Sequence, residues 1–87
     1  MKSVLMFIIE GCPYCKKALR YMEEIMEETP KYKEIPFRIV DENLYPEFAE
    51  EYDYYYVPTY FVEDEKVHEG AAEKDDIRRV FEKAEEE

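Results

Sequence analysis

The spacing of apolar residues changes along the chain, and this change predicts its first two elements. The continuous apolar run from Val4 to Ile9 is rich in strand-forming residues, so it predicts a central strand buried on both faces. From Cys12 onwards apolar residues recur every three or four positions, which predicts a helix ending near Thr29-Pro30. Pro13 fits the first helical turn, where no backbone N–H is needed. The apolar face of this helix consists of Cys15, Ala18, Leu19, Met22, Ile25 and Met26.

A second strand and a short helix follow. The segment Pro36–Asp41 alternates enough to form a strand, and Phe37, Ile39 or Val40 is expected to point inward. Pro46 suits the opening turn of a helix. The four-residue spacing of Leu44, Phe48 and Tyr52 predicts its buried face.

The last third of the chain predicts a hairpin and a terminal helix. Thr59–Val62 contains β-branched and aromatic residues, and Lys66–Glu69 returns after a turn at Glu63, Asp64 and Glu65. Asp75 or Asp76 is the expected N-cap of the last helix. Its apolar stripe consists of Ile77, Val80, Phe81 and Ala84.

The resulting element order is βαβαββα, which predicts an α/β fold. The strand–helix–strand opening implies a parallel pair, and the later hairpin implies an antiparallel pair. We therefore expect a mixed four-stranded sheet with helices on both faces. The buried first strand would lie inside this sheet, and its carboxyl end would deliver Cys12 to an edge where ligands of open α/β sheets bind.

Length and charge restrict the classes of function. Eighty-seven residues predict one domain, residues 1–87, and nothing in the sequence demands more than a monomer. The net charge of −11 argues against nucleic-acid binding, which requires clustered Lys and Arg. No apolar stretch is long enough to span a membrane, and the run from Val4 is too short for a signal peptide. We expect a cytoplasmic protein without a membrane partner.

Both cysteines of the chain lie in the segment Cys12-Pro13-Tyr14-Cys15, at the predicted change from strand to helix. In a reducing compartment such a pair is more often catalytic or metal-binding than structural. Helical N–H groups and the helix dipole are expected to lower the pKa of Cys12, with the nearby Lys16, Lys17 and Arg20 adding positive potential. Cys15, one turn inside, is expected to remain a thiol. Cys12 is therefore the predicted nucleophile and Cys15 the predicted resolving thiol.

This motif after an apolar strand, together with Val57-Pro58-Thr59 before a later strand, resembles the glutaredoxin family, and the resemblance covers nearly the whole chain. It implies a thioredoxin-type fold with a cis Val57-Pro58 peptide bond. It also implies that Val57 offers free backbone groups, on which an extended thiol substrate docks as an added strand. The implied activity is thiol–disulfide exchange on protein disulfides or glutathione mixed disulfides.

The same resemblance implies a glutathione site and no bound cofactor, with glutathione as co-substrate. Tyr14, Val57, Pro58 and Thr59 match positions at or beside the tripeptide. Gly70 and Glu73 fall in the segment that matches the family's Gly-Gly-x-x-Asp pattern, which keeps one glycine and exchanges Asp for Glu; Asp75 or Asp76 could substitute. A second departure is the sequence Ile8-Ile9-Glu10-Gly11, where the family usually has Lys or Arg; Lys16, Lys17 or Arg38 could supply the missing charge.

Three alternatives stay open. The first is a thioredoxin-like dithiol reductase whose electrons come from a flavoprotein reductase instead of glutathione. The second is a metal or iron–sulfur module, although Cys12 and Cys15 supply only two ligands and the single histidine, His68, is predicted on a distant hairpin; we predict no metal site. The third is a non-enzymatic binding domain on the same fold.

Four tyrosines before Val57 allow two interpretations. They could form a substrate-facing rim, since aromatic side chains with polar tips suit protein recognition. Alternatively, Tyr52 packs under the second helix while the other three cover the edge of the sheet, which is the interpretation that the pattern favours. The tyrosines are Tyr52, Tyr54, Tyr55 and Tyr56.

Overall fold

Strand β1 (Val4–Ile8) lies inside a four-stranded sheet, as its apolar run predicts. It pairs in parallel with β2 (Phe37–Asp41) and in antiparallel with β3 (Thr59–Val62). Strand β4 (Glu65–Glu69) pairs in antiparallel with β3, which gives the order β2-β1-β3-β4. The predicted mixed sheet is confirmed.

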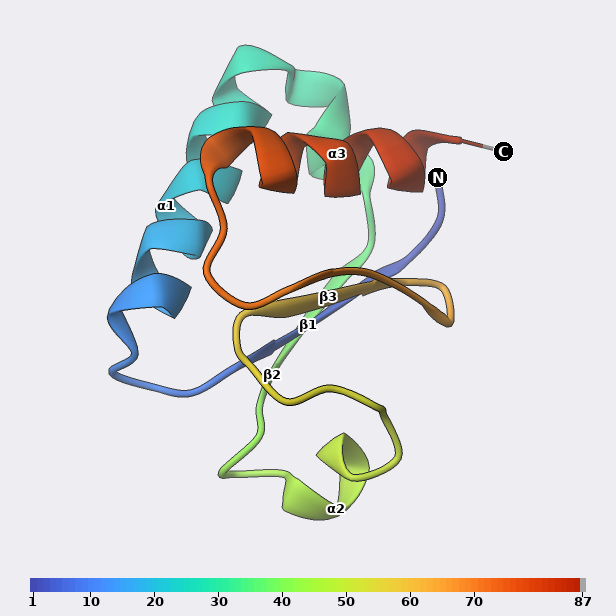
Figure 1. Ribbon diagram of the computed structural model, residues 1–87. Coiled ribbons are helices and arrows are strands. Elements are labelled where there is room, and N and C mark those ends of the chain that lie inside the picture. Colours follow the sequence, from blue (N-terminus) through green and yellow to red (C-terminus); the bar gives the residue numbers. More distant parts are fainter. Residues whose placement is uncertain (87) are drawn as a thin grey trace.

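The helices lie on both faces of this sheet, as predicted (Figure 1). Helices α1 (Pro13–Glu28) and α3 (Lys74–Glu85) cover one face, and the single-turn α2 (Pro46–Ala49) lies on the other. A 3₁₀ helix, η1 (Pro30–Glu34), follows α1 and was not predicted. The structure is a computed structural model that describes residues 1–86, so the last residue of the predicted domain lies outside it. No helix within these residues is long and apolar enough to cross a membrane.

Two apolar clusters hold the layers together. Beneath α1 and α3, Phe81 is fully buried between the rings of Tyr32 and Phe37, with centroids 5.2 and 5.3 Å away. On the α2 face Phe7 is the centre of an aromatic cluster, and four ring centroids lie 4.7 to 6.0 Å from its own. These four rings belong to Phe48, Tyr52, Tyr54 and Phe61.

Two predicted core residues are exposed, each for a different reason. Leu44 was expected on the buried face of that helix, but it precedes Pro46 in the connecting loop and is 68% exposed. Ile39 was one of the residues expected to point inward from the second strand, but it lies on the edge strand β2 and is 46% exposed. In β2, Val40 is buried and Phe37 packs against the α1–α3 cluster.

Several boundaries differ from prediction for local reasons. The first strand ends at Ile8, because the next carbonyl, that of Ile9, accepts the Cys12 N–H at 3.1 Å and turns the chain. The second strand begins at Phe37, one residue after the predicted Pro36. The fourth strand begins at Glu65, one residue before the predicted Lys66. Thr59–Val62 has the predicted bounds.

The N-cap predicted for α3 is wrong. The helix is capped at Glu73, and neither Asp75 nor Asp76 occupies that position. Asp76 lies at the third helical position, where its carboxylate accepts the Glu73 N–H at 2.9 Å. Carboxylates in the first turn stabilise a helix by this bond and by their charge. Acidic residues therefore do mark the start of α3, but the N-cap lies at Glu73, before the two predicted aspartates.

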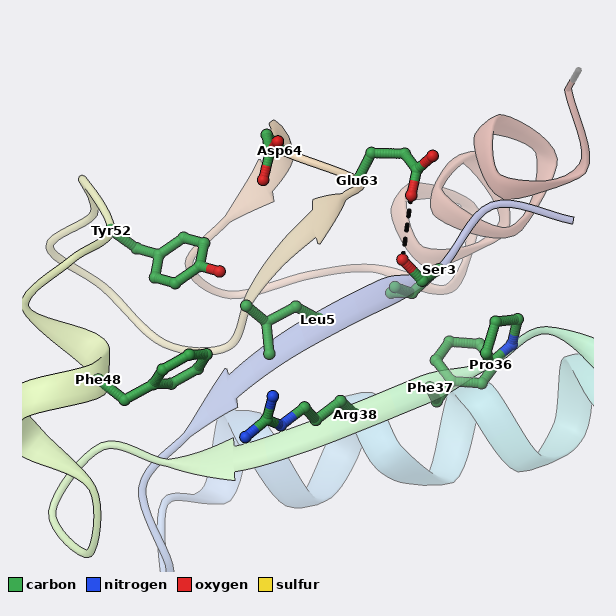
Figure 2. A pocket seen from close by; sticks show the side chains of 10 residues that line it. Ser3, Leu5, Pro36, Phe37, Arg38, Phe48, Tyr52, Glu63 and Asp64 are labelled. Carbon is green, nitrogen blue, oxygen red and sulfur yellow. Dashed lines mark hydrogen bonds between the residues drawn. The ribbon is translucent and has the colours of Figure 1, made fainter.

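The short α2 also leaves part of its sheet face uncovered. A hollow of about 480 Å³ lies there. Figure 2 shows the side chains that line it, among them Leu5 on β1. The Arg38 guanidinium lies 4.8 Å from the Phe48 ring centre, and at the other end the Ser3 hydroxyl donates to Glu63 at 3.0 Å (Figure 2). This hollow lies at the start of β1, whereas the cysteines follow the end of β1, so it is separate from the dithiol.

Candidate functional site

The turn between β1 and α1 places Cys12 at the helix start. Gly11 has φ +88°, a conformation that L side chains rarely adopt, so glycine suits this turn. Cys12 is the N-cap of α1 in an extended conformation, and Pro13 occupies the first turn, as predicted. The Cys12 carbonyl accepts the Lys16 N–H at 3.1 Å. The first sulfur therefore faces the unpaired N–H groups of the helix end.

These N–H groups lower the pKa of Cys12. The largest contribution is the hydrogen bond from the Cys15 backbone N–H. Burial, the next largest, opposes it, and the Tyr14 N–H and the Cys15 side chain lower the pKa further. The positive charges of Lys16, Lys17 and Arg20 were also expected to lower this pKa, but they are not among the causes of the shift. The Lys17 and Arg20 side chains instead lie 3.8 Å from Glu73 and 3.9 Å from Glu24, respectively.

Cys15 has the opposite environment. It is 2% exposed, and this burial raises the pKa of its thiol to about 11, against the Ile9 backbone N–H, which lowers it. Hydrogen bonding to Cys12 and the negative charges of Cys12 and Glu42 raise the pKa of Cys15 further. Both cysteines are free, and Cys12 is partly exposed. The structure thus places a thiolate-favouring sulfur at the surface and a protonated one beneath it.

The loop before β3 lies at the same edge of the sheet. The Val57-Pro58 peptide bond is cis, as the resemblance implied. The Pro58 carbonyl accepts the Gly70 N–H at 2.8 Å, whereas within residues 1–86 no hydrogen bond occupies the Val57 N–H or C=O. Thr59 is fully buried and its hydroxyl donates to the Tyr56 carbonyl, so its side chain supports the loop and offers no ligand surface.

This loop is anchored by Glu69, a residue that no sequence pattern singled out. One carboxylate oxygen of Glu69, on β4, accepts the N–H groups of Tyr55 and Tyr56 at 2.5 and 3.0 Å. Its other oxygen lies 2.7 Å from the Lys66 ammonium. The lysine, followed by these N–H groups, lowers the pKa of Glu69 to about 2. No local pattern marks Glu69, because the N–H groups that it accepts belong to the loop before β3, far from it in sequence.

The four tyrosines divide between the two interpretations. Tyr52 and Tyr54 pack against Phe7, and the Tyr54 hydroxyl donates to Glu42 at 3.0 Å. Tyr55 and Tyr56 are instead 85% and 70% exposed, so they do not cover the edge of the sheet as expected. Burial and the bond to Glu42 raise the pKa of Tyr54.

The other residues implied for glutathione surround this edge. Tyr14, in the first turn of α1, is 58% exposed. Gly70 has φ +91° and approaches the side chain of Tyr56, and the Glu73 carboxylate is exposed and lies 3.8 Å from Lys17. Glu10 is also exposed. The predicted residues gather at one edge, but it is rich in carboxylates.

The side chains that could bind a metal ion include the single histidine, His68, and the two cysteines. Within residues 1–86 no three His, Cys, Asp or Glu side chains are grouped so as to hold a metal ion. Nε2 of His68 lies 3.1 and 3.2 Å from the carbonyl oxygens of Gly70 and Ala71, respectively. Any metal module would need ligands beyond those this segment groups together.

Comparison with known proteins decides the family. Residues 3–82 match the model of the thioredoxin domain. The chain belongs to this family. Disulfide oxidoreductases are built on this fold, and the cysteine pair gives this member the same enzyme class. No curated protein matches the sequence.

Solved thioredoxins share the fold. The oxidised thioredoxin from Plasmodium falciparum is 23% identical with a TM-score of 0.70, over 93% of this chain and 78% of that one. A thioredoxin from Fasciola hepatica is 21% identical with a TM-score of 0.69, over 94% and 79% of the two chains. At these identities the likeness shows the fold alone, and membership of the glutaredoxin branch stays a prediction.

Proposed function

We propose that this protein reduces protein disulfides by dithiol exchange, with Cys12 as nucleophile and Cys15 as resolving thiol. The observation that supports this is the opposite environment of the two sulfurs. Cys12 is partly exposed with a lowered pKa, and Cys15 is buried with a pKa raised to about 11. A thiolate attacks disulfides, and a sulfur that stays protonated does not compete with it.

The reaction balances in two steps. The Cys12 thiolate attacks one substrate sulfur, a mixed disulfide forms, and the other substrate sulfur leaves as a thiolate that takes up a proton. Cys15 then loses its proton and attacks Cys12, which releases the second substrate thiol. The substrate gains two electrons and two protons, and the protein keeps the Cys12–Cys15 disulfide until an external thiol or dithiol reduces it.

The free backbone groups of Val57 would orient the substrate. Main-chain hydrogen bonds to an extended segment hold it as an added strand, independently of its side chains. The exposed rings of Tyr14 and Tyr56 would border such a segment. Backbone recognition of this kind suits a reductase that acts on protein disulfides.

Glutathione as electron donor is the second candidate. It is favoured by Tyr14, Val57 and Gly70, which match positions of the glutaredoxin site. The carboxylates of Glu10 and Glu73 disfavour it, because glutathione is itself an anion. A flavoprotein-reduced dithiol is the alternative donor.

The test combines trapping with a choice of donor. Cys15→Ser should accumulate a mixed disulfide on Cys12 when mixed with oxidised insulin, detected by mass spectrometry, and Cys12→Ser should accumulate none. Wild-type turnover with dithiothreitol but not with glutathione supports a dithiol donor, and comparable turnover with both supports the glutaredoxin type. Trapping at Cys15 in Cys12→Ser would reverse the assigned roles.

A further inference from the structure

A mostly apolar groove of about 390 Å³ lies beside the dithiol. Its walls include Ile8 and Ile9 at the end of β1, Leu19 on α1, and Leu44 from the loop after β2. Cys15 also lines it, so the groove reaches the reacting pair. An apolar recess next to a reactive group is a place where a substrate side chain can be held.

The sheet order puts this groove opposite the Val57 loop. Strand β1, which leads to the cysteines, lies between β2 and β3. Val57 comes just before β3, whereas Leu44 follows β2. A segment bound along Val57 with its sulfur at Cys12 can therefore extend side chains across the dithiol toward the groove.

The outer wall of the groove is held in place although it lies in a loop. The Asp41 carbonyl accepts the Leu44 N–H at 3.1 Å, and the Asp41 carboxylate accepts the N–H groups of Asn43 and Glu10 at 2.8 and 2.9 Å. Leu44 is thereby fixed as an exposed apolar ridge. Because Leu44 lines the groove, it extends the apolar surface that a substrate side chain can contact.

The charges around the groove favour a cationic partner. Glu10 and Asp41 line it, and Glu42 follows Asp41. Among residues 1–86 none of these three carboxylates takes part in an ion pair, although the described surface has many such pairs. Lys16 supplies one positive charge on the rim, which leaves the local balance negative. The net charge of −11 adds to this field.

We propose that the groove receives an apolar side chain of the protein substrate, flanked by Lys or Arg, so that the enzyme prefers disulfides in basic, apolar segments. This inference rests on the proposed function and names its substrate class. The apolar side chain would contact Leu44 and Leu19, and the basic side chain would face Glu10 and Asp41. Complementary charge increases mainly the rate of encounter, so the preference should depend on salt.

The test uses symmetrical peptide disulfides, each made of two copies of a short peptide with one cysteine. Three peptides carry Leu and Lys, Leu and Glu, or Ser and Lys beside the cysteine. Reduced protein is mixed with each disulfide, the reaction is quenched with acid, and the released peptide thiol is measured by chromatography. At low salt the Leu-Lys disulfide should react roughly tenfold faster than the Leu-Glu disulfide, and high salt should reduce this ratio.

Two variants and one matched control locate the effect. Leu44→Ser should slow reaction of the Leu-Lys disulfide about fivefold and leave the Ser-Lys disulfide unchanged, because only the former loses an apolar contact. Ile39→Ser is the matched control, since Ile39 is exposed but does not line the groove. Glu10→Gln should reduce the preference for Lys over Glu. Circular dichroism checks that each variant is folded.

The possible outcomes separate this inference from the proposed function. Equal rates for the Lys and Glu peptides, or equal effects of Leu44→Ser and Ile39→Ser, would overturn the inference and leave disulfide reduction intact. Failure to reduce any of the peptides would overturn both. A dimer in light scattering, with the rate per molecule falling as protein concentration rises, would assign the groove to a second copy and overturn the inference.

Discussion

At the scale of single residues, the two cysteines have opposite pKa shifts within one helical turn. Alkylation by iodoacetamide should reflect this, because only the thiolate reacts. The alkylation rate of Cys12 should reach half its maximum at a pH below that of an ordinary thiol. Cys15 should react appreciably only as the pH approaches about 11, the value to which burial raises its pKa.

Peptide mapping by mass spectrometry after short exposures at a series of pH values measures both rates. Cys15→Ser and Cys12→Ser serve as controls that report one site each. Faster labelling of Cys15 than of Cys12 near neutral pH would contradict the assignment.

The Glu69 carboxylate is expected to stabilise the folded state in a way that depends on pH. Its folded pKa of about 2 lies below its ordinary value of 4.5, so its ionised form favours the folded state. That contribution is fully present above the unfolded pKa and is lost as pH falls from about 4.5 through about 2. Glu69→Gln should therefore be less stable than wild type near neutral pH, and the difference should shrink toward pH 2.

Urea unfolding followed by circular dichroism at a series of pH values measures this difference. Glu82→Gln is the matched control, because Glu82 is exposed on α3. Glu69→Gln should also weaken substrate binding at Val57, since the carboxylate holds the backbone of Tyr55 and Tyr56. A stability difference independent of pH would contradict the role given to the carboxylate.

At the scale of elements, the strands and the two long helices were predicted well, whereas the buried face of the short second helix was not. The buried β1, the sixteen-residue α1 and the apolar stripe of α3 all match the predictions. Each buries several side chains that belong to one continuous or regularly spaced apolar pattern. The prediction for Leu44 rested on a three-member spacing, which the loop after β2 also satisfies. Ile39 is exposed because its strand is at the edge, and strand order is a property of the whole sheet.

The candidate site likewise combines features that adjacent residues predict with contacts between segments far apart in the sequence. The position of Cys12 at a helix start comes from adjacent residues, so the sequence alone predicted the direction of its pKa shift. The cis peptide bond before Pro58 required a family resemblance. The contacts of Glu69 with Tyr55 and of Tyr54 with Glu42 join different elements, and no local pattern encodes them.

The packing of α3 against the rest of the protein depends on Phe81. Phe81 is fully buried between η1 and β2, where Tyr32 and Phe37 contact its ring. Phe81→Ala should lower the free energy of unfolding by about 3–5 kcal/mol, through lost burial and a residual cavity. Urea unfolding near neutral pH measures it, with Glu82→Ala expected within about 0.5 kcal/mol of wild type. A loss below about 1 kcal/mol for Phe81→Ala would mean that this core is not packed as described.

At the scale of the whole molecule, local ion pairs coexist with a large excess of negative charge. The Lys74 ammonium joins α3 to α1, lying 3.0 Å from Glu24 and 2.7 Å from Glu28, and Arg78 lies 3.1 Å from Glu28. Each such exposed pair contributes little. The net charge of −11 spreads repulsion over the entire surface.

Salt separates these two contributions. Raising ionic strength from about 0.01 M to about 0.15 M shortens the Debye length from about 30 Å to about 8 Å, which screens distant repulsion more than contacts within 4 Å. We therefore expect the Tm to rise with sodium chloride at neutral pH, measured by circular dichroism. Lys74→Met should lower the Tm at low salt, since it removes two contacts and makes the net charge more negative, yet it should keep the rise with salt. A Tm that falls with salt in wild type but not in Lys74→Met would show instead that the contacts between α1 and α3 outweigh the repulsion.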